Sequence, residues 1–406
     1  MVCVWVNKRD WRSPGPIVNV GLRNAYHLAL AGLETHFFVG AGSDSDTDAD
    51  LRDFYRLEPT SRLQIHRISR RTVVPMHGKR YPQTTSRRIF TAAAHTIDHL
   101  ASTVPAPVTV FTREPSFLPR LALLRYRYPQ KVRAFYEAHD LYADLSWKKR
   151  DRLPVKAADR RQQLLERLFL PRLDGLIGIT PEQTALYQNI FPRLRCFYLP
   201  LGTELGPVVS SDELERRRLL RQIVYVGRLT RTKGLAWLLA VAGRLREKGV
   251  QVAFWGGNAQ QGEQVRSMAK EFGPGDNVTT VGTRSPEALG RALATEASVT
   301  VLPLEDDFYN RNLTCPAKGL DYLAHSLPVV ASDLPSTRAL LGNGGAATYV
   351  TPGDVDGMAR ACLALLEDAK LYAAVSAASQ QRAREVSWAT RVGKLVEMAE
   401  ETLRSQ

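Results

Sequence analysis

The sequence is poor in cysteine and has no long apolar run. Its 406 residues include only four scattered cysteines, Cys3, Cys196, Cys315 and Cys362. Without a Cys-x-x-Cys pair, this set argues against a disulfide framework or a cysteine zinc site and is typical of a reducing compartment. The first apolar run, Val2–Val6, is shorter than a signal peptide core, and no later run has the length of a spanning helix. We therefore expect a cytoplasmic protein, with the inner face of the membrane as an alternative location.

The first half of the chain lacks acidic residues relative to basic ones. Residues 1–200 carry 31 Lys and Arg against 18 Asp and Glu, whereas residues 201–406 carry 24 against 23. Ser61–Phe90 has eight basic residues and no acid, and residues 148–161 form a second basic cluster just after Leu145 and Trp147. One such cluster is typical of a solvated face. Two in one half indicate a polyanionic surface, for which anionic lipid headgroups are the first candidate.

The sequence also lacks a recognisable metal motif or nucleic-acid-binding module. The acidic run Ser43–Asp50 resembles a calcium loop, but Ala49 and Tyr55 stand where that loop needs glycine and glutamate. We interpret the run as a solvated loop that caps the following helix. No metal, cofactor or nucleic-acid partner is expected.

What is present is an alternation of short β-branched runs with longer helical stretches, which predicts an α/β fold with parallel strands. Ten strands are predicted: Val2–Val6, Thr35–Val39, Val108–Phe111, Val132–Glu137, Gly175–Gly178, Gln222–Val226, Gln251–Trp255, Val278–Val281, Val299–Leu302 and Pro328–Ala331. The helices expected between or after them are Val18–Ala31, Leu235–Lys248, Gln260–Phe272, Pro286–Ala292, Lys318–Leu323, Val355–Glu367 and Trp388–Leu403.

This pattern occurs twice, which predicts two doubly wound domains. Prolines and glycines interrupt it near Leu199–Pro207. We assign residues 1–203 to a basic N-terminal domain and residues 204–387 to a C-terminal domain. Residues 388–406 form a last helix able to pack on either domain. Ligands of open α/β sheets bind at the carboxyl ends of the strands, so we expect a ligand cleft where the two sheets face each other.

The segment Ile223–Gly234 reads as a buried strand, a turn and a helix start. Gly227 ends the strand, and Arg228 and Lys233 leave it within one short loop. Two cations at a strand's carboxyl end suit a diphosphate, whose negative charge grows as a sugar leaves. An ordinary basic turn is the alternative interpretation.

A second motif, Asn312–Ala324, reads as an anion site followed by a short helix. Pro316 suits the first helical position, and the free amides around Thr314 to Lys318 would bind an anion with help from the helix dipole. Asp321 lies one turn beyond Lys318 and could accept hydrogen bonds from a ribose. In the alternative interpretation, Lys318 and Asp321 are a solvated ion pair at i, i+3.

These segments resemble the family 4 glycosyltransferases, retaining enzymes with the GT-B fold. The matching motifs are Val226-Gly-Arg-Leu…Lys233-Gly234, Gly256-Gly257, Val281-Gly282 and Ser387-Trp388. The resemblance implies that Arg228 and Lys233 hold the donor diphosphate and that Asp321 holds the ribose. It also implies donor contacts from Gly227, Gly257, Thr314 and Cys315. Lys318 would add a point charge to the anion site at the start of the short helix.

The acidic motif departs from the family pattern. Many members carry two glutamates with seven residues between them, whereas this chain has Leu313 in place of the first and Asp321 in place of the second. Donor-sugar contacts are therefore expected from Glu305–Asn310 and from backbone amides.

The first half carries weaker forms of the family's motifs. Gly15, in the turn Trp11–Ile17, would approach the donor phosphate, with an ordinary Pro/Gly turn as the alternative. His139 resembles the family's strand-end histidine, which implies contact with the donor sugar. Glu204 takes the acidic position of the interdomain motif.

The sequence thus predicts a retaining, metal-independent hexosyltransferase. It would use a UDP- or GDP-sugar and a saccharide or lipid-linked acceptor, in cell-surface polysaccharide or glycolipid synthesis. The alternatives are a GT-B phosphorylase, a non-catalytic nucleotide-sugar-binding protein and a nucleic-acid-binding protein.

Overall fold

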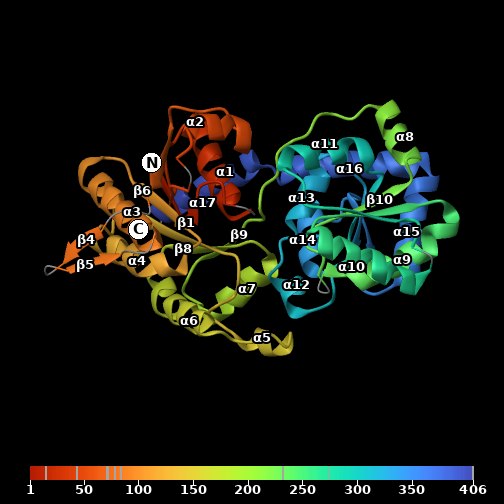
Figure 1. Ribbon diagram of the computed structural model, residues 1–406. Helices are drawn as coiled ribbons and strands as arrows, with labels where there is room; N and C mark the ends of the chain where they lie inside the picture. Colours follow the sequence, from red (N-terminus) through yellow and green to blue (C-terminus); the bar gives the residue numbers. More distant parts are fainter. Residues whose placement is uncertain are drawn as a thin grey trace. The chain divides into compact units, whose positions relative to one another are not determined.

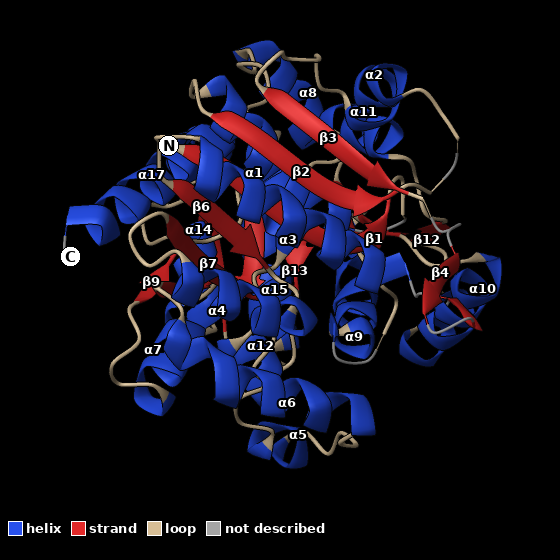
Figure 2. Ribbon diagram, turned by 90° about the vertical axis from the view of Figure 1, so that its left-hand side faces the viewer, coloured by secondary structure: helices blue, strands red, loops and turns tan. Residues whose placement is uncertain are grey.

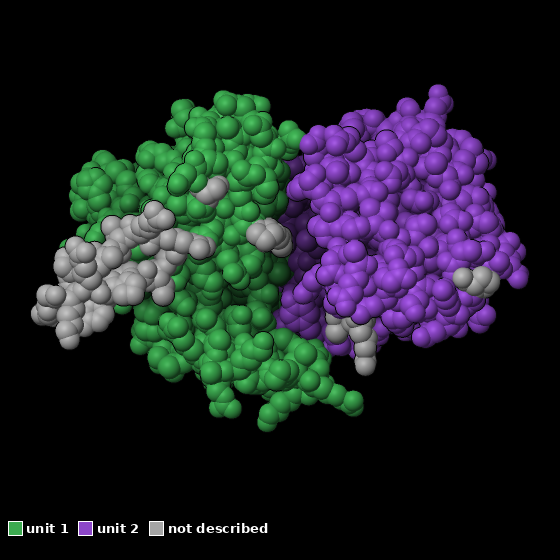
Figure 3. Space-filling view, in the orientation of Figure 1, with its two compact units in different colours: residues 1–179, 183–199, 388–406 green, residues 180–182, 200–387 purple. Residues whose placement is uncertain are grey.

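The computed structural model describes residues 1–13, 16–42, 44–69, 73–76, 79–82, 85–230, 233–273 and 275–404. The chain divides into two compact units, coloured separately in Figure 3. Unit 1 comprises Met1–Ile179, Gln183–Leu199 and Trp388–Gln406, and unit 2 comprises Thr180–Glu182 and Pro200–Ser387. The last helix of the chain therefore belongs to unit 1.

Unit 1 is built on a seven-stranded parallel sheet in the order β3-β2-β1-β6-β7-β8-β9. Figure 2 shows β2, β3 and β6 pointing the same way. The strands are β1 (Val2–Asp10), β2 (Glu34–Gly40), β3 (Leu63–Ile68), β6 (Val108–Thr112), β7 (Val132–Ala138), β8 (Gly175–Gly178) and β9 (Cys196–Tyr198), with a separate hairpin of β4 (Val73–Met76) and β5 (Lys79–Pro82). The helices are α1 (Pro16–Leu30), α2 (Thr47–Asp50), α3 (Thr85–Thr103), α4 (Leu118–Arg127), α5 (Ser146–Arg150), α6 (Ala157–Phe169), α7 (Pro181–Ile190) and α17 (Trp388–Arg404).

Aromatic side chains hold the centre of this sheet together. Trp5 of β1 is in register with Phe111 of β6, which is in register with Phe135 of β7. Their rings stack with centroids 5.3 Å and 5.5 Å apart, and all three side chains are buried. Aromatic neighbours on adjacent strands stabilise a sheet beyond the area they bury. This ladder fixes the register of three strands, of which β1 and β7 precede the unit's candidate site residues.

Unit 2 is built on a six-stranded parallel sheet in the order β12-β11-β10-β13-β14-β15. The strands are β10 (Gln222–Val226), β11 (Gln251–Trp255), β12 (Val278–Val281), β13 (Val299–Leu302), β14 (Val329–Ser332) and β15 (Ala347–Val350). The helices are α8 (Ser211–Leu219), α9 (Leu235–Leu245), α10 (Ala259–Ala269), α11 (Pro286–Glu296), α12 (Phe308–Asn312), α13 (Ala317–Ala324), α14 (Pro335–Leu341), α15 (Val355–Glu367) and α16 (Ala369–Glu385). Figure 1 shows α11, α13 and α16 on one side of the sheet and α9 and α10 on the other.

The predicted strands of the second half match the structure closely. Four of the five have the predicted bounds, and the fifth, β14, is shifted by one residue. Such strands are covered on both faces, so they read as continuous apolar runs. The prediction missed β15 as well as β3, β9 and the β4–β5 hairpin. Edge strands such as β3 are only half-buried, so their apolar signal is weak.

One interpretation of the first half needs correction. Asp46 caps α2, because its side chain accepts a hydrogen bond from the Ala49 amide at 2.7 Å, but Asp50 is buried and not solvated. Asp50 accepts a 2.7 Å hydrogen bond from Trp11 Nε1 and pairs with Arg12 and Arg67. The acidic run therefore ends by anchoring the segment that follows β1.

Among the described residues, no helix combines the length and apolar character needed to cross a bilayer. Within the same residues, no group of three or more His, Cys, Asp and Glu side chains is placed to hold a metal ion. All four cysteines are among the described residues, and none of them is in a disulfide.

Candidate functional site

The order of strands in unit 2 reverses between β10 and β13. From β10 the chain winds outward through β11 and β12, and it then returns to β13 and winds the other way through β14 and β15. The two strands pair in parallel through Ile223 with Val299 and Val224 with Thr300, so their carboxyl ends lie side by side. Ligands of open α/β sheets bind at such a reversal, because the following loops diverge there. The loops after Val226 and Leu302 are therefore the candidate site.

The loop after β10 holds both predicted cations, and its geometry depends on Gly234. This glycine has φ +69°, and a Cβ there would lie 1.7 Å from the carbonyl oxygen of Pro303. Only glycine allows the two loops to approach so closely. Gly234 also begins α9 as its N-cap. Lys233, the preceding residue, is thus held against the loop that follows β13.

Lys233 is tied to that second loop by its side chain. Its Nζ donates a 3.1 Å hydrogen bond to Oδ1 of Asn310. Burial, with a smaller contribution from the nearby charge of Arg228, lowers the pKa of Lys233 to about 8. A desolvated ammonium facing a second cation is an unfavourable arrangement that an anionic ligand would relieve. Strongly shifted titratable groups of this kind mark candidate functional sites.

Asn310 connects the two loops by hydrogen bonds, although the sequence predicted it only as part of the range Glu305–Asn310. The residue is 1% exposed, and its Nδ2 donates to the Glu305 carbonyl at 3.1 Å and to Asp307 Oδ2 at 3.1 Å. Its Oδ1 therefore faces the two remaining donors, Lys233 Nζ and Thr314 Oγ1. The only available signal was its place in a short helix after a buried strand, which does not reveal a partner 77 residues away.

Arg228 is the more exposed of the two cations. Its carbonyl oxygen accepts a 2.9 Å hydrogen bond from the Tyr225 hydroxyl, which fixes the backbone at the strand's end. Within the described part of the chain, the guanidinium makes no ion pair with a carboxylate. It is therefore available to an anion from solution.

The Asn312–Ala324 motif differs from the prediction in two respects. Pro316 is the N-cap of α13 rather than its first residue. The amide of Thr314 is not free, because it donates to the Tyr309 carbonyl at 3.0 Å. The predicted amide site therefore loses one donor. The Gly319 amide is also used, because it donates to the Pro316 carbonyl at 2.7 Å. The remaining candidates are the amides of Ala317 and Lys318 at the start of α13.

Lys318 and Asp321 bond to each other in the structure, at 2.9 Å between Nζ and Oδ2. This is the ion-pair alternative raised from the sequence. Both side chains are about 40% exposed, and such pairs contribute under about 1 kcal/mol, so a diphosphate could displace Asp321 at little cost. Tyr322, four residues after Lys318 on the same helical face, accepts a 2.9 Å hydrogen bond from the Val226 amide at the end of β10. Lys318 therefore lies on the side of α13 that meets β10.

The other predicted donor contacts of unit 2 surround this corner. Gly227 donates its amide to the Trp255 carbonyl at 3.0 Å, and Gly257, with φ +71°, receives two hydrogen bonds from Thr283. Glu305 lies in the loop after β13, where its carbonyl accepts from Asn310. Cys315, just before α13, is half-buried.

In unit 1, His139 follows β7 and is part of a buried ionic cluster. Its Nε2 lies 2.5 Å from Oε1 of Glu137, whose other oxygen bonds to Arg391 of α17. Burial, reinforced by the charge of Arg113, lowers the pKa of His139 to about 4. The imidazole is therefore neutral near pH 7. Gly15, the other predicted residue of this unit, lies outside the described residues.

Residues 221–368 match the family model described as "Glycosyl transferases group 1". A stretch of 69 residues is 38% identical to the phosphatidyl-myo-inositol mannosyltransferase of Mycolicibacterium smegmatis, covering 17% of this chain and 18% of that protein. The aligned stretch is thus under a fifth of the relative's length.

Solved structures match over nearly the whole chain. The sucrose-phosphate synthase of Thermosynechococcus elongatus has a TM-score of 0.67 at 18% identity, over 100% of this chain and 99% of that one. HepE of Anabaena in complex with UDP and glucose has a TM-score of 0.64 at 14% identity, over 98% and 99%. Together with the two parallel sheets, these findings confirm the GT-B fold and the resemblance to family 4 glycosyltransferases.

Proposed function

We propose that the protein is a retaining glycosyltransferase that transfers a sugar from a UDP- or GDP-sugar to a saccharide or lipid-linked acceptor, in cell-surface polysaccharide or glycolipid synthesis. The observation that carries the proposal is the pair of cations at the β10/β13 reversal, with Lys233 desolvated against Asn310. The family match over residues 221–368 and the UDP named in the HepE structures support it.

The donor would be held mainly by unit 2. Arg228, Lys233 and Lys318 would bind the diphosphate and stabilise the charge that grows as the sugar leaves, in place of a metal ion. After releasing Lys318, Asp321 would accept hydrogen bonds from the ribose. His139 of unit 1 would contact the transferred sugar. From the resemblance to retaining enzymes, we propose attack on the same face as departure.

We expect the affinity for a nucleoside diphosphate to depend on pH through Lys233. Its pKa is about 8 in the free protein, and a bound diphosphate would return it toward the ordinary value of about 10.4. Binding then takes up a proton above pH 8, so affinity falls as pH rises, by about tenfold between pH 7 and pH 9. Calorimetric titration with UDP and GDP at these pH values measures it, with Lys233→Met as the control that removes this dependence.

The same titrations test the proposed function. Binding of UDP or GDP, followed by sugar transfer from the matching nucleotide sugar, would support it. Absence of binding to any nucleoside diphosphate would refute it. Sugar release by free phosphate would instead indicate a phosphorylase, and binding without transfer would indicate a non-catalytic protein.

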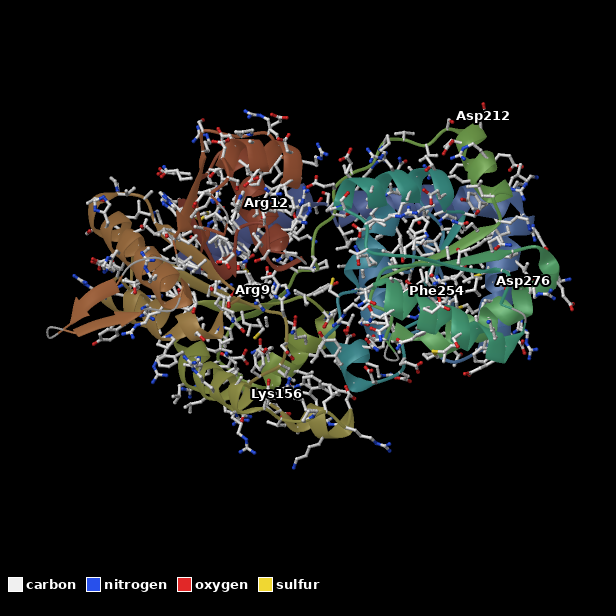
Figure 4. The ribbon with its side chains drawn as sticks, viewed as in Figure 1. Arg9, Arg12, Lys156, Asp212, Phe254 and Asp276 are labelled. Atoms are coloured by element: carbon white, nitrogen blue, oxygen red, sulfur yellow. The ribbon has the colours of Figure 1, made fainter. Side chains whose placement is uncertain are left out.

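We further propose that the acceptor is reached at an anionic lipid surface through α6. The acids of this helix, Asp159 and Glu166, are buried, whereas its exposed positions after the first two alanines carry arginines and leucines. Leu164 is 58% exposed and Leu168 is 46% exposed. Exposed leucines among cations suit the boundary between headgroups and acyl chains. Figure 4 labels Lys156 at the start of this helix. The exposed positions of this face are Arg160, Arg161, Leu164, Arg167 and Leu168.

Some residues in and beside the two basic clusters are unavailable to such a surface. Trp147 and Leu145, which precede the basic cluster, are buried and unavailable to a membrane. In the other cluster, Arg67 is used internally, since it bonds to the Ala41 carbonyl and pairs with Asp50. Residues 70–72, 77–78 and 83–84 lie outside the described residues.

Replacing both Leu164 and Leu168 with Glu should weaken binding to anionic vesicles by at least about tenfold, because each buried CH₂ contributes about 0.8 kcal/mol and the new charges repel the surface. Sedimentation with phosphatidylglycerol-containing vesicles measures this, and pure phosphatidylcholine vesicles should bind neither protein. Leu219→Glu is the matched control, since Leu219 is 61% exposed on unit 2. Equal binding of the double variant and the wild type would contradict the assignment.

A further inference from the structure

His139, which follows β7, contacts a buried ion pair. The ion pair joins Glu137 on β7 to Arg391 on α17, which lies 254 residues later in the chain. The side chains of Glu137 and Arg391 are 0% and 2% exposed, whereas that of His139 is 16% exposed. The cluster therefore has a buried end and an open end, and the imidazole is at the open end.

Arg391 is fixed by three separate acceptors. Its Nε donates to Asn24 Oδ1 at 2.9 Å, its Nη1 to the Leu199 carbonyl at 2.7 Å, and its Nη2 to Glu137 Oε2. Asn24 is itself oriented, because its Nδ2 donates to the Val20 carbonyl at 2.8 Å. A guanidinium engaged on three sides cannot swing away, so Glu137 has a permanent counter-charge.

That counter-charge keeps Glu137 ionised. Burial alone would raise the pKa of this carboxyl, but Arg391 and the hydrogen bond from His139 outweigh it and lower the pKa to about 2. Breaking a buried ion pair is costly because it leaves a buried charge uncompensated. The carboxylate of Glu137 should therefore stay paired with the guanidinium of Arg391. With one oxygen taken by Arg391, the other faces His139.

A carboxylate oxygen can only accept a hydrogen bond, so the nitrogen 2.5 Å from it must carry the proton. The alternative tautomer would bring a lone pair of Nε2 against the carboxylate. Arg113, which follows β6, disfavours a second proton on the ring through its positive charge. The charged groups around the imidazole are thus Glu137 on β7, Arg113 after β6 and Arg391 on α17.

We propose that Glu137 and Arg391 are positioning residues that hold His139 as the neutral tautomer protonated on Nε2, so that Nδ1 accepts a hydrogen bond from a substrate hydroxyl. In this role His139 orients a hydroxyl and does not act as a general acid. The hydrogen bond from a substrate hydroxyl to Nδ1 rests on the proposed glycosyltransferase function, whereas the tautomer of His139 does not. The carboxyl-terminal helix thereby contributes to the site through Arg391.

The tautomer can be measured without substrate. Long-range ¹H–¹⁵N NMR of protein labelled in its eight histidines distinguishes the two neutral forms and the imidazolium, and loss of one signal set in His139→Gln assigns the residue. We expect the Nε2-protonated neutral form from pH 5.5 to pH 8. In Glu137→Gln, Arg391 retains the amide oxygen and the NH₂ group faces the ring, so the tautomer should switch to Nδ1-protonated. In Arg391→Met, Glu137 loses its counter-charge, so its carboxylate should stabilise the imidazolium. The pKa of His139 should then rise toward neutrality.

Arg125→Gln is the matched control, because it breaks another ion pair of unit 1, with Arg125 Nε 2.8 Å from Asp174 Oδ2, without touching the histidine. It should leave the His139 signals unchanged, and Arg391→Lys should restore the wild-type tautomer. With a nucleotide sugar, Glu137→Gln should lower kcat by about tenfold, the loss of one hydrogen bond, and leave UDP affinity unchanged. A wild-type His139 protonated on Nδ1, or a Glu137→Gln variant that keeps the Nε2 form, would overturn the proposal even if transfer is observed.

Discussion

Replacing Lys233 with Met should reduce sugar transfer by about 10²- to 10³-fold while leaving the fold intact. Methionine keeps the packed stem of the side chain but removes the ammonium that faces Asn310. Removing one preorganised charge donor from a transition-state site has effects of this size. Nucleoside diphosphate affinity should fall as well, since a hydrogen bond to a charged group is worth about 1.5–3 kcal/mol. Steady-state kinetics and calorimetry with the best nucleotide sugar measure both quantities.

Lys270→Met is the control for this experiment. Lys270 is an exposed lysine of unit 2 between α10 and β12. It therefore lies on the side of the amino ends of the strands, whereas the site lies at their carboxyl ends. The same chemical change there should leave transfer unaltered. Arg228→Ala and Lys318→Ala should each abolish most transfer with an unchanged melting temperature. Near-normal turnover in Lys233→Met would exclude Lys233 from the donor site.

Replacing Glu166 with Ala should destabilise unit 1 by about 3–5 kcal/mol. This fully buried carboxyl accepts hydrogen bonds from the Tyr136 hydroxyl at 2.9 Å, the Tyr187 hydroxyl at 2.7 Å and the Ala143 amide at 2.6 Å. Alanine would leave the Tyr136 hydroxyl and the Ala143 amide without this acceptor and create a cavity, whereas the Tyr187 hydroxyl would keep the Asp140 carbonyl as its acceptor. For a unit of this size the melting temperature should fall by roughly 6–20 °C. Thermal unfolding followed by circular dichroism measures the shift.

Glu166 should also make the wild type less stable as pH rises. Burial outweighs the three donors and raises the pKa of Glu166 to about 8. The folded state then holds the proton more tightly than the unfolded chain, whose carboxyl titrates near about 4.3. Free energy of unfolding therefore decreases from about pH 5 to pH 8, and this slope should vanish in Glu166→Ala. The exposed Glu400→Ala should shift stability by under about 0.5 kcal/mol and keep the slope. An unchanged melting temperature in Glu166→Ala would contradict this role.

Glu166 also shows how the core positions the segment after His139. Glu166 accepts a hydrogen bond from the Ala143 amide, and Arg167 Nε donates one to the Ala143 carbonyl. The Tyr187 hydroxyl donates another to the Asp140 carbonyl. From the sequence, Glu166 is one acid within a basic helix. Its burial is decided by the tyrosines of β7 and α7, which arrive from other parts of the chain.

The sequence alone determined the architecture and the loops that carry the cations. Strands such as Gln222–Val226 are buried on both faces, so an unbroken apolar run ending at a glycine locates them within the chain. The positions of Arg228 and Lys233 follow directly, because both are in the short loop that such a strand must end in. Local patterning is sufficient wherever the structure is set by neighbours along the chain.

Tertiary structure decided which side chains meet. The bond from Lys233 to Asn310 spans 77 residues and that from Arg391 to Glu137 spans 254, and no local pattern encodes either one. The burial of Trp147 and Asp50, both expected in solvent-facing segments, was decided in the same way. Polar side chains acquire their partners, and with them their charge states, only when the packed core brings distant strands and helices together, because the cost of burying a polar group depends on what it then contacts.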